Sequence, residues 1–204
     1  MIRLQYLVSN LAPPEVFMNI KGTAFVTAKV SMTAAFGEER WNAFLGKLAE
    51  KDKYFKNMIM SITPIPVEKH LFFLDEMLKE FFNNDKNQYQ IFGRVAAKFS
   101  LSPGGAYHSY LRVSDLNRFV SEVSPKLWST YFDGGKLTGE LKGNVAHFKI
   151  TDVPIKHIYF EYMVIGFYKQ AFKIFGKKVV EKKIKSFARG DDMIHYQYEI
   201  IGNR

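Results

Sequence analysis

Residues 136–151 read KLTGELKGNVAHFKIT, and this stretch decides the fold class. Its apolar side chains alternate with polar ones, which is the period of a strand with one buried face. Gly143-Asn144 divides the stretch and fits a two-residue hairpin turn with glycine at its first central position. The stretch therefore predicts an antiparallel hairpin.

The chain before this hairpin has the 3.6-residue period of helices. Gly37 is well placed to stop the first of them, although the β-branched Val26 and Val30 leave a strand interpretation open there. Ser114 is placed to cap the last, and Pro125 to restart it. We expect helices over residues 23–36, around 41–48, from 66 to about 83, over 85–99 and over 114–132.

The chain after the hairpin repeats the pattern of helix and hairpin. Residues 155–175 are apolar nearly all round, which is typical of a helix buried on more than one side. Residues 177–188 and 193–201 then flank a polar turn and alternate as a second hairpin. The prediction is an α+β fold, in which the helical N-terminal two-thirds pack with a small C-terminal antiparallel sheet made of two hairpins joined by a buried helix. Residues 1–204 have the length of a single domain.

Composition excludes several classes of protein. The chain has no Cys, which excludes disulfides, thiol catalysis and Cys-ligated zinc. The longest uncharged stretch, residues 99–111, contains Ser, Pro and Gly, so we expect no membrane span and a cytoplasmic protein.

The net charge of +9 is concentrated near residues 177–185. On an alternating strand, Lys178 and Lys182 face one way, whereas Lys183 and Lys185 face the other. Because this divides the charge between two faces, we do not expect nucleic acid as a partner.

The familiar catalytic motifs and metal-ligand spacings are missing from the sequence. We therefore predict no catalytic and no metal-binding residues, which favours a protein that is not an enzyme. His157, near Asp152, could still form an acid–base pair. The aromatic surplus is the positive signal, because Trp128 and Tyr131 would approach Tyr162 if their helices pack together. Such a group of side chains lines either a pocket for a flat apolar ligand or an aromatic-rich core.

Several short motifs carry a family resemblance over about residues 20–201. They are Lys21-Gly22, Phe36-Gly37-Glu38-Glu39-Arg40-Trp41, Leu127-Trp128, Tyr131-Phe132-Asp133-Gly134-Gly135, Ala188-Arg189-Gly190-Asp191-Asp192 and Tyr196-Gln197-Tyr198. In order and spacing they resemble a family of uncharacterised bacterial proteins abundant in myxobacteria. That family is distantly similar to the 4-vinyl reductase domain, to haem–nitric oxide sensor domains and to the small subunits of the TRAPP tethering complex. The resemblance implies a helical fold with a C-terminal antiparallel sheet that often holds a hydrophobic ligand.

One position departs from the haem sensors. Their axial histidine lies in a stretch like Leu-Asp-Asn-Leu-His, whereas the similar stretch here, residues 114–118, ends in Arg118. A guanidinium has no lone pair to give to iron, so we expect no haem and no other cofactor, unless His108, His157 or Tyr162 takes that place. Arg118 is left to meet an anionic ligand or a neighbouring carboxylate on the surface.

The sequence therefore predicts a non-enzymatic small-molecule-binding or sensory module. Its hydrophobic or anionic ligand would be held in an aromatic-lined interior by Arg118, Trp128, Tyr131 and Tyr162. The alternative is a structural or protein-interaction module that resembles the tethering subunits and acts through a homodimer or another partner surface.

Overall fold

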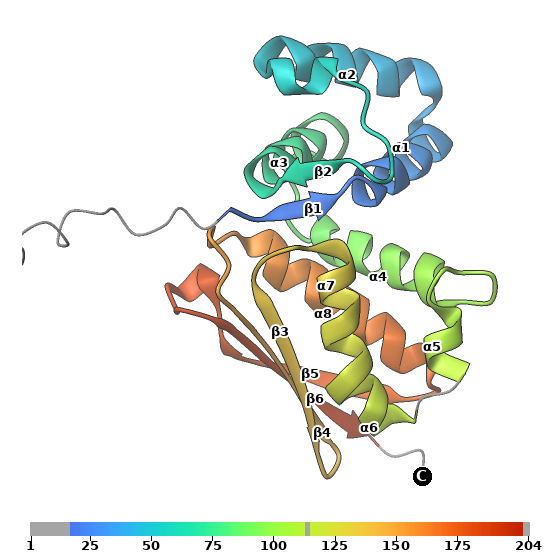
Figure 1. Cartoon of the computed structure of the whole chain (residues 1–204), viewed down its shortest axis with the longest axis vertical. Helices are drawn as coiled ribbons and strands as arrows, with labels where there is room; N and C mark the ends of the chain where they lie inside the picture. The colour runs from blue at the N-terminus through green and yellow to red at the C-terminus, as the bar shows by residue number, and fades with distance from the viewer. Residues whose placement is uncertain (1–16, 113–114, 202–204) are drawn as a thin grey trace, which may run out of the picture.

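The computed structural model describes residues 17–112 and 115–201 (Figure 1). The predicted α+β fold is confirmed: helices precede and cover a small antiparallel sheet. The helices are α1 (Thr23–Phe36), α2 (Glu38–Lys51), α3 (Val67–Phe82), α4 (Gln88–Leu101), α5 (His108–Arg112), α6 (Leu116–Arg118), α7 (Ser124–Tyr131) and α8 (Ile158–Ile174). The strands are β1 (Asn19–Lys21), β2 (Pro64–Pro66), β3 (Lys136–Lys142), β4 (Val145–Thr151), β5 (Lys178–Lys185) and β6 (Ile194–Ile201).

The N-terminal part consists of α1, α2 and α3, with β1 paired to β2 beside them (Figure 1). Residues 23–36, for which β-branched side chains also allowed a strand, form the helix α1, and Gly37 caps its end as expected. Pro66 closes β2 and leads directly into α3, which ends at Phe82 with Asn83 as its C-cap. The pairing of β1 with β2 had no signal in the sequence, because each strand is only three residues long.

The C-terminal sheet has the strand order β3-β4-β6-β5, and every neighbouring pair is antiparallel. Its two hairpins are joined by α8, as predicted. Phe148 of the sheet stacks on Tyr168 of α8 with ring centroids 3.8 Å apart. Aromatic rings thus fill the layer between the sheet and α8.

The other side of α8 lies directly against α4. A Cβ atom added to Gly93 would lie 2.0 Å from the carbonyl oxygen of Met163, and one added to Gly166 would lie 1.9 Å from that of Gln90. Only glycine allows two helix backbones to approach this closely. The helix α8 is therefore enclosed by α4 and the sheet, which explains its nearly uniform apolar surface.

A buried carboxylate fastens α8 to the strands β5 and β6. Glu161 is fully buried and accepts hydrogen bonds from the Ser186 hydroxyl at 2.7 Å and from the Tyr196 hydroxyl at 2.8 Å. It also forms an ion pair with Lys183. Burial alone would raise the pKa of Glu161, but these three partners hold it below its usual value.

The basic side chains of β5 are arranged differently from the prediction. A β-bulge between Lys183 and Lys185 shifts the register, so that Lys185 pairs with His195 on the outer face of the sheet. Lys178 and Lys182 face outward as well, and only Lys183 turns inward. The division of charge expected from strict alternation is therefore wrong for Lys185.

Two further expectations concern helix starts and membrane spans. The predicted cap Ser114 lies outside the described residues, and α6 is capped by Asp115, whose side chain accepts a hydrogen bond from the Arg118 amide at 2.7 Å. Within residues 17–112 and 115–201, no helix has the length and apolar character needed to cross a bilayer.

Candidate ligand-binding site

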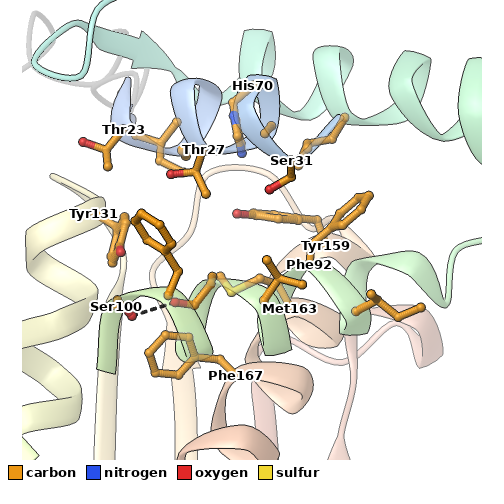
Figure 2. A pocket seen from close by; sticks show the side chains of 18 of the residues that line it. Thr23, Thr27, Ser31, His70, Phe92, Ser100, Tyr131, Tyr159, Met163 and Phe167 are labelled. Carbon is orange, nitrogen blue, oxygen red and sulfur yellow. Dashed lines mark hydrogen bonds between the residues drawn. The ribbon is translucent and has the colours of Figure 1, made fainter. Parts of the chain in front are cut away.

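A cavity of about 450 Å³ lies between the N-terminal helices and the C-terminal part of the molecule. Figure 2 shows α1 above it, α4 and α8 below it, and Tyr131 of α7 at one end. Its lining is predominantly apolar. This volume lies within the range of about 300–1,000 Å³ that is typical of small-molecule sites.

The wall formed by α1 is made of small side chains. Thr23, Thr27 and Ser31 follow one another at four-residue intervals and line the cavity in a row of hydroxyl groups (Figure 2). Ala24 and Ala28 lie beside them. Small residues leave the space open at positions where a typical core helix would carry Leu or Phe.

The opposite wall is formed by larger side chains of α4 and α8. Phe92, Met163 and Phe167 lie across the cavity from α1 (Figure 2). Farther along α4, Val95 and Phe99 line the cavity and are also exposed, Phe99 by 69%. The cavity is thus a largely apolar space with an apolar rim that reaches the surface.

His70 is the one imidazole among the described residues that line the cavity. Its side chain is 2% exposed, and neither ring nitrogen has a hydrogen-bond partner in the described part of the chain. Burial, with a smaller contribution from His157, lowers the pKa of His70 to about 3. The ring is therefore neutral at physiological pH, and one of its nitrogens has a free lone pair.

A polar cluster joins α3, α4 and the start of α8. The Asp75 carboxylate of α3 accepts hydrogen bonds from the Tyr89 hydroxyl at 2.6 Å, from Lys86 Nζ at 2.7 Å and from His157 Nε2 at 3.2 Å. His157 Nδ1 in turn accepts a hydrogen bond from the Tyr159 amide at the start of α8. His157 therefore pairs with Asp75, which is distant in sequence, and not with the nearby Asp152.

Two of the four predicted ligand-binding residues line the cavity. Trp128 does so while its indole N–H donates to the Gly134 carbonyl at 3.1 Å. Tyr131 lies beside it, and burial, reinforced by Tyr107, raises the pKa of Tyr131 to about 12. A role for these two in ligand binding stays a prediction.

The other two predicted residues lie outside the lining. Arg118 is exposed, and its Nε donates to the Glu122 carboxylate at 3.1 Å, which matches the surface interpretation of this residue. Tyr162 lies with its ring 5.3 Å from Lys183 Nζ, next to the buried Glu161. The structure therefore does not bring the four together.

Sequence reasoning missed His70 and the hydroxyl row of α1. A signal existed for both. His70 interrupts the apolar stripe that continues through Leu74 and Leu78, and residues 23–35 are unusually rich in Ala, Ser and Thr for a buried helix face. Neither signal shows that a cavity separates these two helices from α4.

Comparisons with known proteins give structural neighbours only. The sequence matches no protein-family profile and no curated protein. An H-NOX protein from S. oneidensis in the Fe(II) ligation state superposes with a TM-score of 0.70 at 17% identity, over 91% of this chain and 98% of that one. The same kind of protein in the Fe(II)NO state gives 0.69 at 17%, over 90% and 100%. An H-NOX mutant from K. algicida gives 0.66 at 14%, over 90% and 98%.

This finding corrects the cofactor prediction. The neighbours are haem–nitric oxide sensor domains, so the expectation of no cofactor, with haem disfavoured, is contradicted. That expectation depended on Arg118 in the place of an axial histidine, whereas Arg118 lies on the surface and a different histidine faces the cavity. The similarities to the myxobacterial family, the 4-vinyl reductase domain and the TRAPP subunits stay predictions. At these identities the comparisons establish the fold, and this chain has the fold of the H-NOX domains.

Proposed function

We propose that this chain is a ligand-binding domain of the sensor type, which holds a flat hydrophobic molecule of porphyrin size in the cavity between α1 and α4. The observation that carries the proposal is a cavity of about 450 Å³ whose apolar walls contain one imidazole that has no hydrogen-bond partner among the described residues. The H-NOX fold adds weight, because those neighbours are haem sensors.

The residues of the cavity fit a haem. Aromatic and aliphatic side chains on α4 and α8 suit the apolar faces of the macrocycle, and His70 provides a neutral nitrogen donor. No Lys or Arg is found among the described lining residues, so Thr27, Ser31 and solvent at the Phe99 rim would meet the two carboxylates. When bound, the group would supply an iron that binds diatomic gases.

We propose binding, and not catalysis, as the role of the site. A nucleophile activated by a neighbouring base needs the two side chains within hydrogen-bond distance of each other. His70 has no such partner in the described part of the chain, and the Asp75–His157 pair is committed to holding α3, α4 and α8 together. We therefore propose that the site binds a molecule and does not catalyse its conversion.

Metal-free protoporphyrin IX tests this proposal, because it has the shape of haem without the iron. We expect the purified chain to bind it, as measured by fluorescence titration. Ala28→Phe places a ring in the cavity and should weaken binding by about tenfold or more. Ala43→Phe is the matched control, since Ala43 lies on an exposed face of α2, and it should bind like the wild type. Equal binding by all three proteins, or by none, would refute the proposal.

Further parts of the proposal concern the chain as a whole. We propose that residues 1–204 form one domain and that the protein is cytoplasmic. The interaction-module alternative would act through a homodimer or through another partner surface. Sedimentation velocity of the full chain, with and without protoporphyrin, measures the assembly state directly.

A further inference from the structure

We infer that His70 of α3 coordinates the metal of a metalloporphyrin bound in this cavity, through the lone pair of one imidazole nitrogen. The inference deepens the proposed function and rests on it. The bond is a coordinate one: the nitrogen lone pair enters a free axial position of the metal, and no proton leaves the ring.

The burial of His70 is the first argument. Polar groups inside proteins almost always have hydrogen-bond partners, because an unpartnered one has lost its hydration without compensation. Both nitrogens of His70 lack a partner within residues 17–112 and 115–201, and the side chain is 2% exposed. Figure 2 shows the ring on the same side of the cavity as Thr27 and Ser31. A ligand in the cavity can therefore supply the partner that the chain does not.

The surroundings of His70 indicate which kind of metal. A bare ion needs three or more protein ligands, and no group of three His, Asp or Glu side chains among the described residues could hold one. A metalloporphyrin brings four nitrogens of its own, so one imidazole completes the coordination of a five-coordinate metal. His70, a single nitrogen donor in an apolar wall, therefore fits a metalloporphyrin and not a bare ion.

The other described histidines are committed elsewhere. His157 uses both nitrogens, one toward the Tyr159 amide and one toward Asp75. His147 and His195 contact each other at 3.2 Å on the outer face of the sheet, and His108 is bonded to the Leu101 carbonyl at 2.9 Å. Tyr131 and Tyr159 also line the cavity, but burial raises the pKa of both hydroxyls, which keeps them protonated and makes them poor ligands.

Haemin added to the full chain tests the inference. We expect the reduced wild-type complex to have the absorption spectrum of a histidine-ligated haem. His70→Gly should lose that spectrum and bind haemin at least about tenfold more weakly, and added imidazole should restore the spectrum. His70→Met should shift it to that of a thioether ligand. His147→Ala, on the far face of the sheet, is the control that should leave it unchanged.

Metal-free protoporphyrin IX distinguishes failure of the His70 inference from failure of the proposed porphyrin binding. If His70→Gly binds protoporphyrin like the wild type but has lost the histidine-ligated spectrum, the inference is supported. If both proteins bind haemin with the same spectrum, His70 is not the ligand, although the cavity still binds porphyrins. If the wild type binds protoporphyrin but its haem lacks a histidine ligand, the inference fails in the same way. If no porphyrin binds at all, the proposed function itself fails.

Discussion

The ring of His70 on α3 meets the ring of Tyr159 on α8 edge to face, with centroids 5.4 Å apart and planes inclined at 71°. The same two helices are joined a second time by the Asp75–His157 hydrogen bond. The imidazole of the cavity is therefore packed against the first turn of α8, the helix that connects the two hairpins.

His70→Leu should make the ligand-free protein more stable. The substitution removes a buried imidazole whose nitrogens have no partner in the described chain, and the unmet desolvation of such a group costs about 1–3 kcal/mol. Urea unfolding at pH 7 measures the difference. A stable variant that no longer ligates haem would show that the histidine is kept for binding; a loss of stability would contradict the view that His70 lacks a partner.

The same pair of proteins should differ in pH dependence. The pKa of His70 is about 3 in the folded state and about 6.5 in an unfolded chain, so between these values the unfolded state binds one more proton. Stability is then lost as the pH falls below about 6.5, by up to about 1.4 kcal/mol per pH unit. His70→Leu should lack this contribution. Parallel stability profiles from pH 7 to pH 4.5 would show that burial does not lower the pKa of His70.

Gly93→Ala should destabilise the protein by about 1–3 kcal/mol or more, because the new methyl group would lie 2.0 Å from the Met163 carbonyl and force α4 away from α8. Gly46→Ala is the matched control. Gly46 lies inside α2 with nothing within 4 Å of an added Cβ, so alanine there should stabilise the helix by about 0.5–1 kcal/mol. Thermal and urea unfolding report both signs, and a Gly93→Ala variant as stable as the wild type would disprove the close helix crossing.

Asp75→Asn should cost roughly 1.5–3 kcal/mol, the value of hydrogen bonds to a charged group. Burial alone would raise the pKa of Asp75, but hydrogen bonds from His157, Lys86 and Tyr89 lower it well below its usual value. The carboxylate therefore contributes stability that is present above about pH 4 and lost as the pH falls further, and the variant should lack this acid-side loss. Glu140→Gln is the control, since its ion pair with Lys142 is exposed and its change should stay within about 0.5 kcal/mol.

Glu161→Ala should be among the most damaging single changes, at about 3–5 kcal/mol, because it leaves Lys183 and two hydroxyls without their buried partner. The double variant Glu161→Met with Lys183→Met should be less damaging than Glu161→Ala, since both charges are removed together. Denaturation midpoints of the two variants decide the point. If the double variant is the less stable of the two, the packing of these side chains matters more than their charge.

The sequence by itself determined the long helices, the two hairpins and their order, but not the short strands β1 and β2. The end of α1 at Gly37, the start of α3 after Pro66 and the two hairpins around α8 all follow from the spacing of apolar residues and from turn residues. These signals are local, because a helix or hairpin buries one face at a fixed period wherever it lies in the molecule. The same reasoning predicted Trp128 and Tyr131 as interior residues, because both are aromatic and lie on the apolar face of their helix. Both line the cavity.

Only the tertiary structure decided the site. Asp75 and His157 are 82 positions apart, and nothing in either neighbourhood points to the other. The approach of α4 to α8 depends on two separate glycines, and the outward turn of Lys185 depends on a bulge that strict alternation does not contain. By its position in the sequence, His70 looks like an ordinary core residue of α3. It lines a cavity because α1 carries small side chains at the positions that would otherwise fill this space, and that makes it a candidate ligand. A cavity is the space that remains between elements after they pack, so no single sequence period links the residues that line it from different helices.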